Sequence, residues 1–160
     1  MEKKDVFFEQ DGRVSKVLVD HGDTVTKGQV IVELENKDLE KEIQQLYTDL
    51  GEAQASRRQL QLSRDPESES KLAEVRARIH GYTRQLELLK EKQGNLIVRA
   101  PMDGQVVTWD IRRLLEHRPV MRGQKALQLA NPDGEWELEV FLPEKRIITL
   151  IRPRKIPANR

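Results

Sequence analysis

The stretch DGRVSKVLVDHGDTVTKGQ, residues 11–29, is partly repeated later in the chain. Asp103-Gly104-Gln105-Val106 matches its start at an offset of 92 residues, and Val120-Met121-Arg122-Gly123-Gln124 matches its end at an offset of 95. Apolar side chains at largely alternating positions indicate short β-strands, and the glycines between them indicate turns. The three extra residues of the second copy fall around 112–116, where a turn can lengthen at little entropic cost.

The repeat therefore predicts two β-motifs of the same kind that belong to one domain and bury their apolar faces against each other. The side chains expected in that core are Val17, Val19, Val30, Val32, Val106, Val107, Leu127 and Leu129.

Between the two β-motifs the apolar residues follow a heptad pattern, with steps of three and four residues. The first run is Leu39, Ile43, Leu46, Leu50, Ala53, Arg57 and Leu60, in which only Arg57 is not apolar; the second is Leu72, Val75, Ile79, Tyr82, Leu86 and Leu89. Asp38 is placed to act as an N-cap or first-turn acid, and Ser63-Arg64-Asp65-Pro66 separates the runs. The pattern predicts an antiparallel coiled-coil α-hairpin over residues 37–93, with arms about 35–40 Å long.

The composition of the 160 residues fits such an elongated shape. Hydrophobic residues make up 37% and charged residues 34%, whereas about 45–50% and about 25% are usual for a compact domain. The 28 basic and 27 acidic residues give a net charge of +1, which does not favour nucleic acid as a partner. The absence of cysteine excludes disulfides and thiolate chemistry. No apolar run reaches the roughly 20 residues of a transmembrane helix or the roughly 7–15 of a signal peptide.

The sequence does not indicate an enzyme. His21, His80 and His117 fall in different predicted elements without the spacing of metal ligands, and no glycine-rich phosphate loop is present. Met102 and Met121 are interpreted as filling the core near strand turns rather than as ligands of a soft metal. We therefore expect no catalytic, cofactor or metal site.

Two segments carry a resemblance to a known family. Gly12-x-Val14 with Gly22-Asp23-x-Val25-x-x-Gly28-Gln29 resembles half of a biotinyl-lipoyl-type β-hammerhead, and residues 98–106, VRAPMDGQV, resemble the returning half. With a hairpin between them and strand-like residues 136–140 and Pro143-Glu144 behind, the order resembles that of HlyD-type membrane fusion proteins. These are the periplasmic adaptors of tripartite efflux pumps and type I secretion systems. The resemblance covers about residues 11–145.

The resemblance implies an α+β fold in which a lipoyl-like β-hammerhead is split by the α-hairpin and followed by the start of a β-barrel domain. The expected parts are a first half-motif at 1–36, the hairpin at 37–93, a second half-motif at 94–131, and the opening of the barrel with a tail at 132–160. Residues 151–157 are interpreted as a frayed tail, and the chain as a fragment or a truncated gene product. A periplasmic location is implied, with association to the inner membrane through an anchor outside this chain.

The resemblance also implies a function and partners. The chain would be a non-catalytic adaptor that links an inner-membrane transporter to an outer-membrane channel or another envelope partner, for export of small molecules or proteins. Copies would assemble into a ring. The expected partner contact is the hairpin tip, formed by Arg57, Arg58, Leu60, Leu62, Ser63, Arg64 and Asp65.

The tip departs from one family pattern. Members that dock onto an outer-membrane channel carry Arg, Leu and Ser at heptad spacing, but here Arg64 is the seventh residue after Arg57, and Asp65 is the seventh after Arg58. The alternative interpretation of the arginines is an ordinary solvated helix end.

Two other functions are weighed against the adaptor. In a lipoyl or biotin carrier, Lys37 would be the acceptor lysine, and the glycine of the returning half would follow it closely. Here Gly104 of the returning half lies as far as 67 positions after Lys37, so Lys37 is predicted to be a surface lysine. A plain coiled-coil interaction module with no export role would not need two matching β-motifs at the base of its hairpin.

Overall fold

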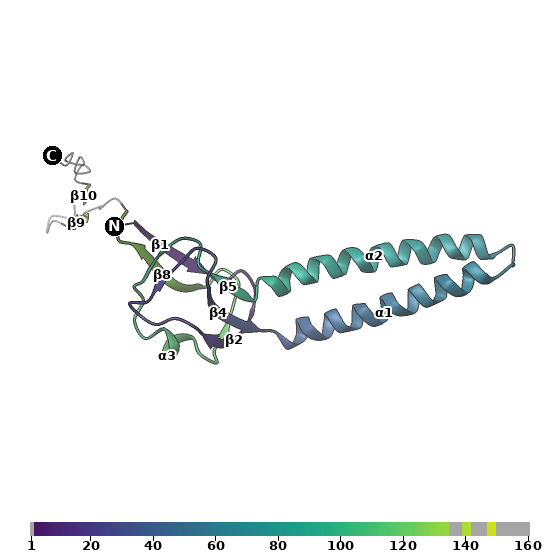
Figure 1. Cartoon of the computed structure of the whole chain (residues 1–160), viewed down its shortest axis with the longest axis horizontal. Coiled ribbons are helices and arrows are strands. Elements are labelled where there is room, and N and C mark those ends of the chain that lie inside the picture. Colours follow the sequence, from purple (N-terminus) through teal and green to yellow (C-terminus); the bar gives the residue numbers. More distant parts are fainter. Residues whose placement is uncertain (1, 135–138, 142–146, 150–160) are drawn as a thin grey trace.

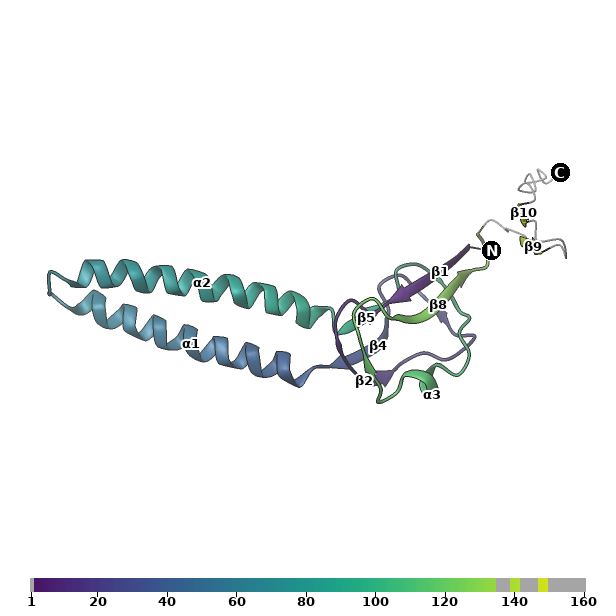
Figure 2. The same cartoon turned by 180° about the vertical axis from the view of Figure 1, so that it is seen from behind.

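The computed structural model describes residues 2–134, 139–141 and 147–149. A small β-structured base, formed by the chain segments on both sides of the hairpin, carries two long antiparallel helices that project from one end (Figure 1). β1 (Glu2–Phe7) begins and β8 (Lys125–Asn131) ends at the opposite end of the base (Figures 1 and 2). The predicted fold class, a lipoyl-like β-domain split by an α-hairpin, is confirmed.

The base consists of two four-stranded antiparallel sheets. Their strand orders are β1-β8-β6-β3 and β5-β4-β2-β7. Each sheet therefore takes strands from both half-motifs, so that neither half could form its sheet alone. The bounds are β1 Glu2–Phe7, β2 Gly12–Val17, β3 Thr24–Val25, β4 Val30–Glu35, β5 Ile97–Arg99, β6 Gly104–Val106, β7 Pro119–Val120 and β8 Lys125–Asn131.

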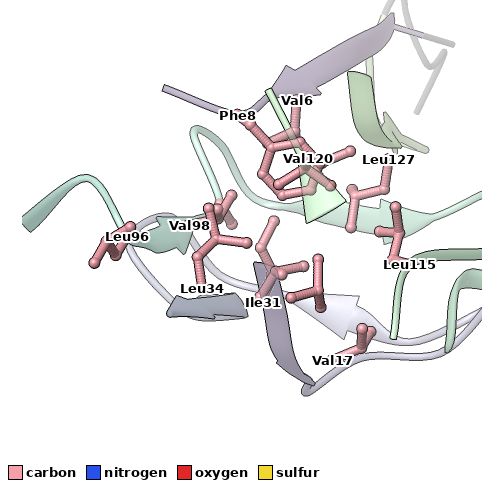
Figure 3. Packing of buried hydrophobic residues seen from close by; sticks show 14 of the residues in the cluster. Val6, Phe8, Val17, Ile31, Leu34, Leu96, Val98, Leu115, Val120 and Leu127 are labelled. Atoms are coloured by element: carbon pink, nitrogen blue, oxygen red, sulfur yellow. The ribbon is translucent and has the colours of Figure 1, made fainter. Parts of the chain in front are cut away.

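The core lies between these sheets, and Figure 3 shows side chains from both half-motifs converging on it. Six of the eight predicted core residues are buried, but Val30 and Val107 are only half-buried. Val30 precedes an irregularity in the pairing of β4 with β5, and its neighbour Ile31 is fully buried. Phe8, 1% exposed, also enters the core directly after β1.

The hairpin is formed by α1 (Lys37–Leu62) and α2 (Ser68–Gly94). The N-cap of α1 is Asn36, whose side chain accepts from the Leu39 N–H at 3.0 Å, and Asp38 lies in the first turn. Figure 2 shows both helices leaving the same end of the base. At the root of the hairpin the seam residues are buried in the same cluster as the core of the base; they are Leu39, Ile43, Leu46, Leu86 and Leu89. The hairpin is therefore an extension of the core of the base.

Two expectations were wrong. Met121 does not fill the core, because its side chain is 70% exposed, whereas Met102 packs against the core as expected. Residues 112–116 do not form a lengthened turn, because the helix α3 (Ile111–Leu115) lies there. Ile111 and Leu115, one helical turn apart, are both buried against the base, and this burial stabilises a helix of only five residues.

Farther along the chain, β9 (Glu139–Phe141) pairs with β10 (Ile147–Thr149) in a two-stranded antiparallel sheet. β9 overlaps the strand-like residues 136–140 at Glu139 and Val140. Trp136, Pro143-Glu144 and the tail at 151–157 lie outside the described residues. Within the described part of the chain, neither long helix has the apolar character that a membrane-spanning segment needs.

Candidate interface at the hairpin tip

The two half-motifs hold each other through a pair of matching turns. The Lys27 N–H donates to the Asp103 carboxylate at 2.6 Å, and the Arg122 N–H donates to the Asp11 carboxylate at 2.7 Å. Each aspartate belongs to one half-motif and each turn to the other. The repeated Asp-Gly and the repeated Gly-Gln turn are thus explained by one contact made twice.

The turns themselves are also alike. Gly28 and Gly123 adopt φ values of +86° and +85°, a backbone region that glycine enters without steric cost. The side-chain oxygen of the glutamine that follows each glycine accepts a backbone N–H three residues earlier, at 3.1 Å for Gln29 and 3.2 Å for Gln124. These bonds fix the backbone of both turns, so that the N–H groups of Lys27 and Arg122 point toward the aspartate carboxylates.

The glycines that follow the two aspartates allow a close approach of backbones. A Cβ on Gly12 would lie 2.8 Å from the Glu35 carbonyl oxygen, and one on Gly104 would lie 2.8 Å from the Ala130 carbonyl oxygen. Gly12 therefore passes the end of β4 at the point where α1 begins.

The start of α1 is tied to this crossing. The Asn36 side chain donates to the Asp11 carbonyl oxygen at 3.0 Å while its own oxygen caps the first turn of α1. The returning arm is held next to it, because the Leu34 N–H donates to the Leu96 carbonyl oxygen at 2.8 Å. Both arms thus leave a base whose backbone is fixed by hydrogen bonds from both half-motifs.

At the far end of the base, β1 is held to β8 by side chains. The Asp5 carboxylate accepts from the Lys125 ammonium at 2.8 Å and from the Gln128 side chain at 2.8 Å. The hydrogen bond from Lys125 lowers the pKa of Asp5 below its ordinary value. This clamp fixes the strand that the sequence pattern did not reveal.

Fewer and smaller seam side chains are buried toward the tip of the hairpin. Beyond the root the buried seam residues are Ala53 and Val75, and they do not belong to the main core cluster. The Arg57 Nε is buried and has no hydrogen-bond partner among the described residues. The distal half of the hairpin is therefore held mainly by helix propensity and a few small contacts.

The tip is a short turn shaped by its own polar side chains. The Asp65 N–H donates to the Ser63 hydroxyl at 3.3 Å, and the Glu67 N–H donates to the Asp65 carboxylate at 3.2 Å. Ser63 and Asp65, two of the seven predicted partner residues, thus maintain the turn.

The other five predicted residues differ in exposure. Leu62 is 85% exposed, Arg58 and Arg64 are exposed, and Arg57 and Leu60 are half-buried. The tip therefore presents one large apolar side chain and two guanidinium groups to a partner. Their role in binding stays a prediction.

The residues considered for other chemistry lie apart. Lys37 is the exposed first residue of α1, not the tip of a tight β-turn as a carrier would require. His21 stacks on Trp109 with ring centroids 3.5 Å apart. Among the described residues, no group of three or more His, Cys, Asp or Glu is placed to hold a metal ion. Trp109, 72% exposed, is a surface feature that the pattern analysis missed, because a single aromatic residue in a loop has no periodicity.

Comparison with known proteins adds a family and a fold. Residues 4–123, which are 120 of the 160 residues, match the family model described as YknX, barrel-sandwich hybrid domain. A search of curated proteins finds no significant match.

Three solved structures illustrate the shared fold. The membrane fusion protein Spr0693 from Streptococcus pneumoniae R6 is similar with a TM-score of 0.69 and 18% identity, over 87% of this chain and 64% of that one. A MacA-MexA chimera with the Pseudomonas aeruginosa MexA α-hairpin domain gives 0.66 and 16%, over 82% and 48%. The periplasmic adaptor protein EmrA gives 0.64 and 15%, over 87% and 76%. The chain thus spans less than two thirds of the first two structures.

Proposed function

Because the chain belongs to the family of the YknX barrel-sandwich hybrid domain, we propose that it is the scaffold of a non-catalytic periplasmic adaptor in an export system. The adaptor would link an inner-membrane transporter to another component of the cell envelope. Two of the three similar structures are named as a membrane fusion protein and a periplasmic adaptor protein, and this supports the proposal. Membership of the HlyD type, a ring of copies and a membrane anchor outside this chain are parts of the same proposal.

The observation that carries the proposal is the rigid attachment of the hairpin. An adaptor must hold a contact surface at a set distance from its base, and a rod on a flexible hinge would not do so. Here both arms are fixed where they enter the base, by Asn36 on α1 and by Leu96 behind α2. With 26 residues in α1, the tip stands about 40 Å beyond the base.

We propose that the base comprises 1–36 and 94–131, that the hairpin comprises 37–93, and that 132–160 open a barrel domain. In this arrangement the base would act as a spacer, and the tip would carry the specific contact. The partner at the tip would offer an apolar pocket for Leu62 flanked by carboxylates for Arg58 and Arg64. An outer-membrane channel is one such partner, although the Arg-Leu-Ser spacing of channel-docking relatives is lacking here.

Site-specific cross-linking in host cells tests this proposal. A photoreactive residue replaces Leu62 at the tip of the full-length protein or, as a control, the 61% exposed Leu88 on α2. We expect a discrete adduct with one envelope protein from position 62 and none with that protein from position 88. Equal adducts from both positions, or none from position 62, would contradict a tip contact.

A further inference from the structure

Two loops, one from each half-motif, meet at the edge of the base beside α3. The ring of His21 stacks on the ring of Trp109, with centroids 3.5 Å apart and planes inclined by 18°. Asp20, the residue before His21, forms an ion pair with the Arg112 Nε at 2.8 Å. These four residues are called the Trp109 site below. Because α3 lies on the base apart from the hairpin (Figure 1), the Trp109 site is separate from the hairpin tip.

Hydrogen bonds hold both loops of the Trp109 site in place. The Gly22 N–H donates to the Val106 carbonyl oxygen at 2.8 Å, which fixes the loop that carries His21. The Gln128 N–H donates to the Thr108 hydroxyl at 2.8 Å, directly before Trp109. The indole is therefore held in a set position before any ligand arrives, so that binding would not have to order it.

The fold does not require an aromatic side chain at position 109. At the repeat offset of 92 residues, Trp109 corresponds to Val17, which is 5% exposed in the core, whereas Trp109 is 72% exposed. In the second half-motif α3 follows at this point, and its Ile111 and Leu115 enter the core instead. Burial in the core thus does not explain this tryptophan, and a rigid, exposed indole is typical of a contact with a ligand or partner.

The groups of the Trp109 site indicate the chemistry of the ligand. His21 covers one face of the indole, so the high exposure of Trp109 leaves the opposite face open. This electron-rich face attracts the C–H groups of an apolar ring surface. The Arg112 and Asp20 side chains are 53% and 57% exposed, and their ion pair uses only Nε and one carboxylate oxygen. Among the described residues, the Nη donors of Arg112 and the second oxygen of Asp20 thus stay available for hydroxyl groups.

Ligands of other classes fit this site less well. Residues 20–23 and 108–113 contain three acidic and two basic side chains, a net charge of −1, which does not favour a phosphate-bearing or carboxylate ligand. An organic cation over the indole would be repelled by the Arg112 guanidinium, which the ion pair holds beside the stack. A neutral ligand with an apolar ring face and hydroxyl groups around its edge avoids both penalties, and a pyranose sugar has this structure.

We propose that the Trp109 site binds a pyranose of a neutral glycan, with the sugar face on the indole and hydroxyl groups on Asp20 and Arg112. This goes beyond the proposed function and involves a different surface. The glycan strand of the cell wall, built of β-linked N-acetylhexosamines, and other oligosaccharides are two sources of the same chemistry. One stacked sugar with two polar partners binds weakly, with a Kd on the order of 1 mM.

Nuclear magnetic resonance of the isotope-labelled chain tests the proposal with two sugars. Chitotetraose represents the cell-wall strand, and maltotetraose represents glycans without acetamido groups. The chain has two tryptophans, and Trp136→Phe assigns the indole N–H signal of Trp109. We expect this signal to shift on titration with at least one sugar, and saturation to pass from the protein to the sugar C–H protons. The stronger response assigns the source, and equal responses assign pyranoses regardless of the acetamido group.

Two results of these titrations would overturn the proposal. One is the absence of any shift with either sugar at about 10 mM, ten times the expected Kd. The other is a larger response to tetramethylammonium or to inorganic phosphate than to either sugar. Neither result affects the proposed function, because cross-linking from position 62 reports on the hairpin tip alone.

Variants distinguish sugar binding from a structural role of the stack. Trp109→Ala should weaken sugar binding about tenfold, and Trp109→Phe, which keeps an aromatic face, should weaken it less. Arg112→Gln should weaken it severalfold through loss of a charged donor. The control Met121→Ala, which removes another large exposed side chain, should bind as the wild type does. A Trp109→Ala variant that melts at a lower temperature but binds sugar as the wild type does would show a purely structural role and overturn the proposal.

Discussion

Replacement of Leu86 by alanine tests whether the hairpin is rooted in the core of the base. Leu86 is 7% exposed on α2 and belongs to the cluster that contains Leu39 and Leu46 of α1 together with the core of the base. Leu88, two residues farther along the same helix, is 61% exposed and provides a matched control. Both changes remove the same atoms and both replace leucine by the best helix former, so helix propensity contributes almost equally to the two.

The expected magnitudes differ severalfold. Loss of a buried leucine side chain costs about 2–5 kcal/mol, because the lost transfer free energy is joined by the cost of a cavity. The lower end, about 2–3 kcal/mol, suits a site between two helices that can close partly around the gap. An exposed leucine lacks both contributions, so Leu88→Ala is expected to change the free energy of unfolding by less than about 0.5 kcal/mol.

Urea denaturation, followed by the helical circular dichroism signal, measures both variants. Leu86→Ala should shift the midpoint to lower urea with little change in slope, and Leu88→Ala should overlay the wild type. Equal losses of stability for the two variants would refute the seam assignment. A Leu86→Ala variant as stable as the wild type would refute the rooting of the hairpin in the core.

Three further predictions concern the base, the arms and the effect of pH. Gly104→Ala should lower the free energy of unfolding by about 1–3 kcal/mol, because its Cβ would lie 2.8 Å from a carbonyl oxygen. The control Gly94→Ala, whose Cβ meets open space, should leave the free energy of unfolding unchanged. Equal melting temperatures for the two variants would contradict the close approach. Gly51 lies inside α1, and a Cβ there would also meet open space. Gly51→Ala should therefore stabilise the hairpin by about 0.5–1 kcal/mol, which slower amide hydrogen exchange in the distal half would show. Unchanged exchange in that half would argue against the weak packing described above. The hydrogen bond from Lys125 lowers the pKa of Asp5, so its stabilising effect is present above the ordinary value of 3.8 and is lost as the pH falls through and below it. The melting temperature of the wild type should accordingly fall more steeply with acid than that of Asp5→Asn, and parallel curves would exclude this clamp.

The parts of the fold that were predictable from sequence are those with a period or a repeat. The heptads over Leu39–Leu60 and Leu72–Leu89 determine the arms because one apolar stripe per helix is enough to pair them. The repeated Asp-Gly and Gly-Gln elements predicted two like motifs. The reciprocal bonds from Asp11 and Asp103 to the other half's turn give that repeat its physical reason.

The elements that were missed depend on contacts between residues distant in the chain. β1 reads EKKDVF, and only Val6 in it is buried, so it has no apolar alternation. It is a strand because β8 pairs with it and because Phe8, directly after it, enters the core. α3 is too short for periodicity, although Ile111 and Leu115 at a spacing of four were a usable signal.

The position of the hairpin tip was predictable, but the exposure of its side chains was not. The heptad break located the tip near Pro66, and five of the seven proposed residues have side chains that no turn hydrogen bond occupies. The pattern could not distinguish Leu62, which faces solvent, from Ser63 and Asp65, which accept hydrogen bonds within the turn. That distinction depends on the local backbone of a single turn.

We propose that this chain is the scaffold of an export adaptor and carries no prosthetic group. Both points are tested most directly by quantitative mass spectrometry of complexes isolated from chemically cross-linked host membranes with a tagged full-length protein. We expect one membrane transporter enriched in constant ratio to the tagged protein, with Lys37 unmodified. Isolation without any transporter and with a lipoyl or biotinyl group on Lys37 would contradict it and identify a carrier instead.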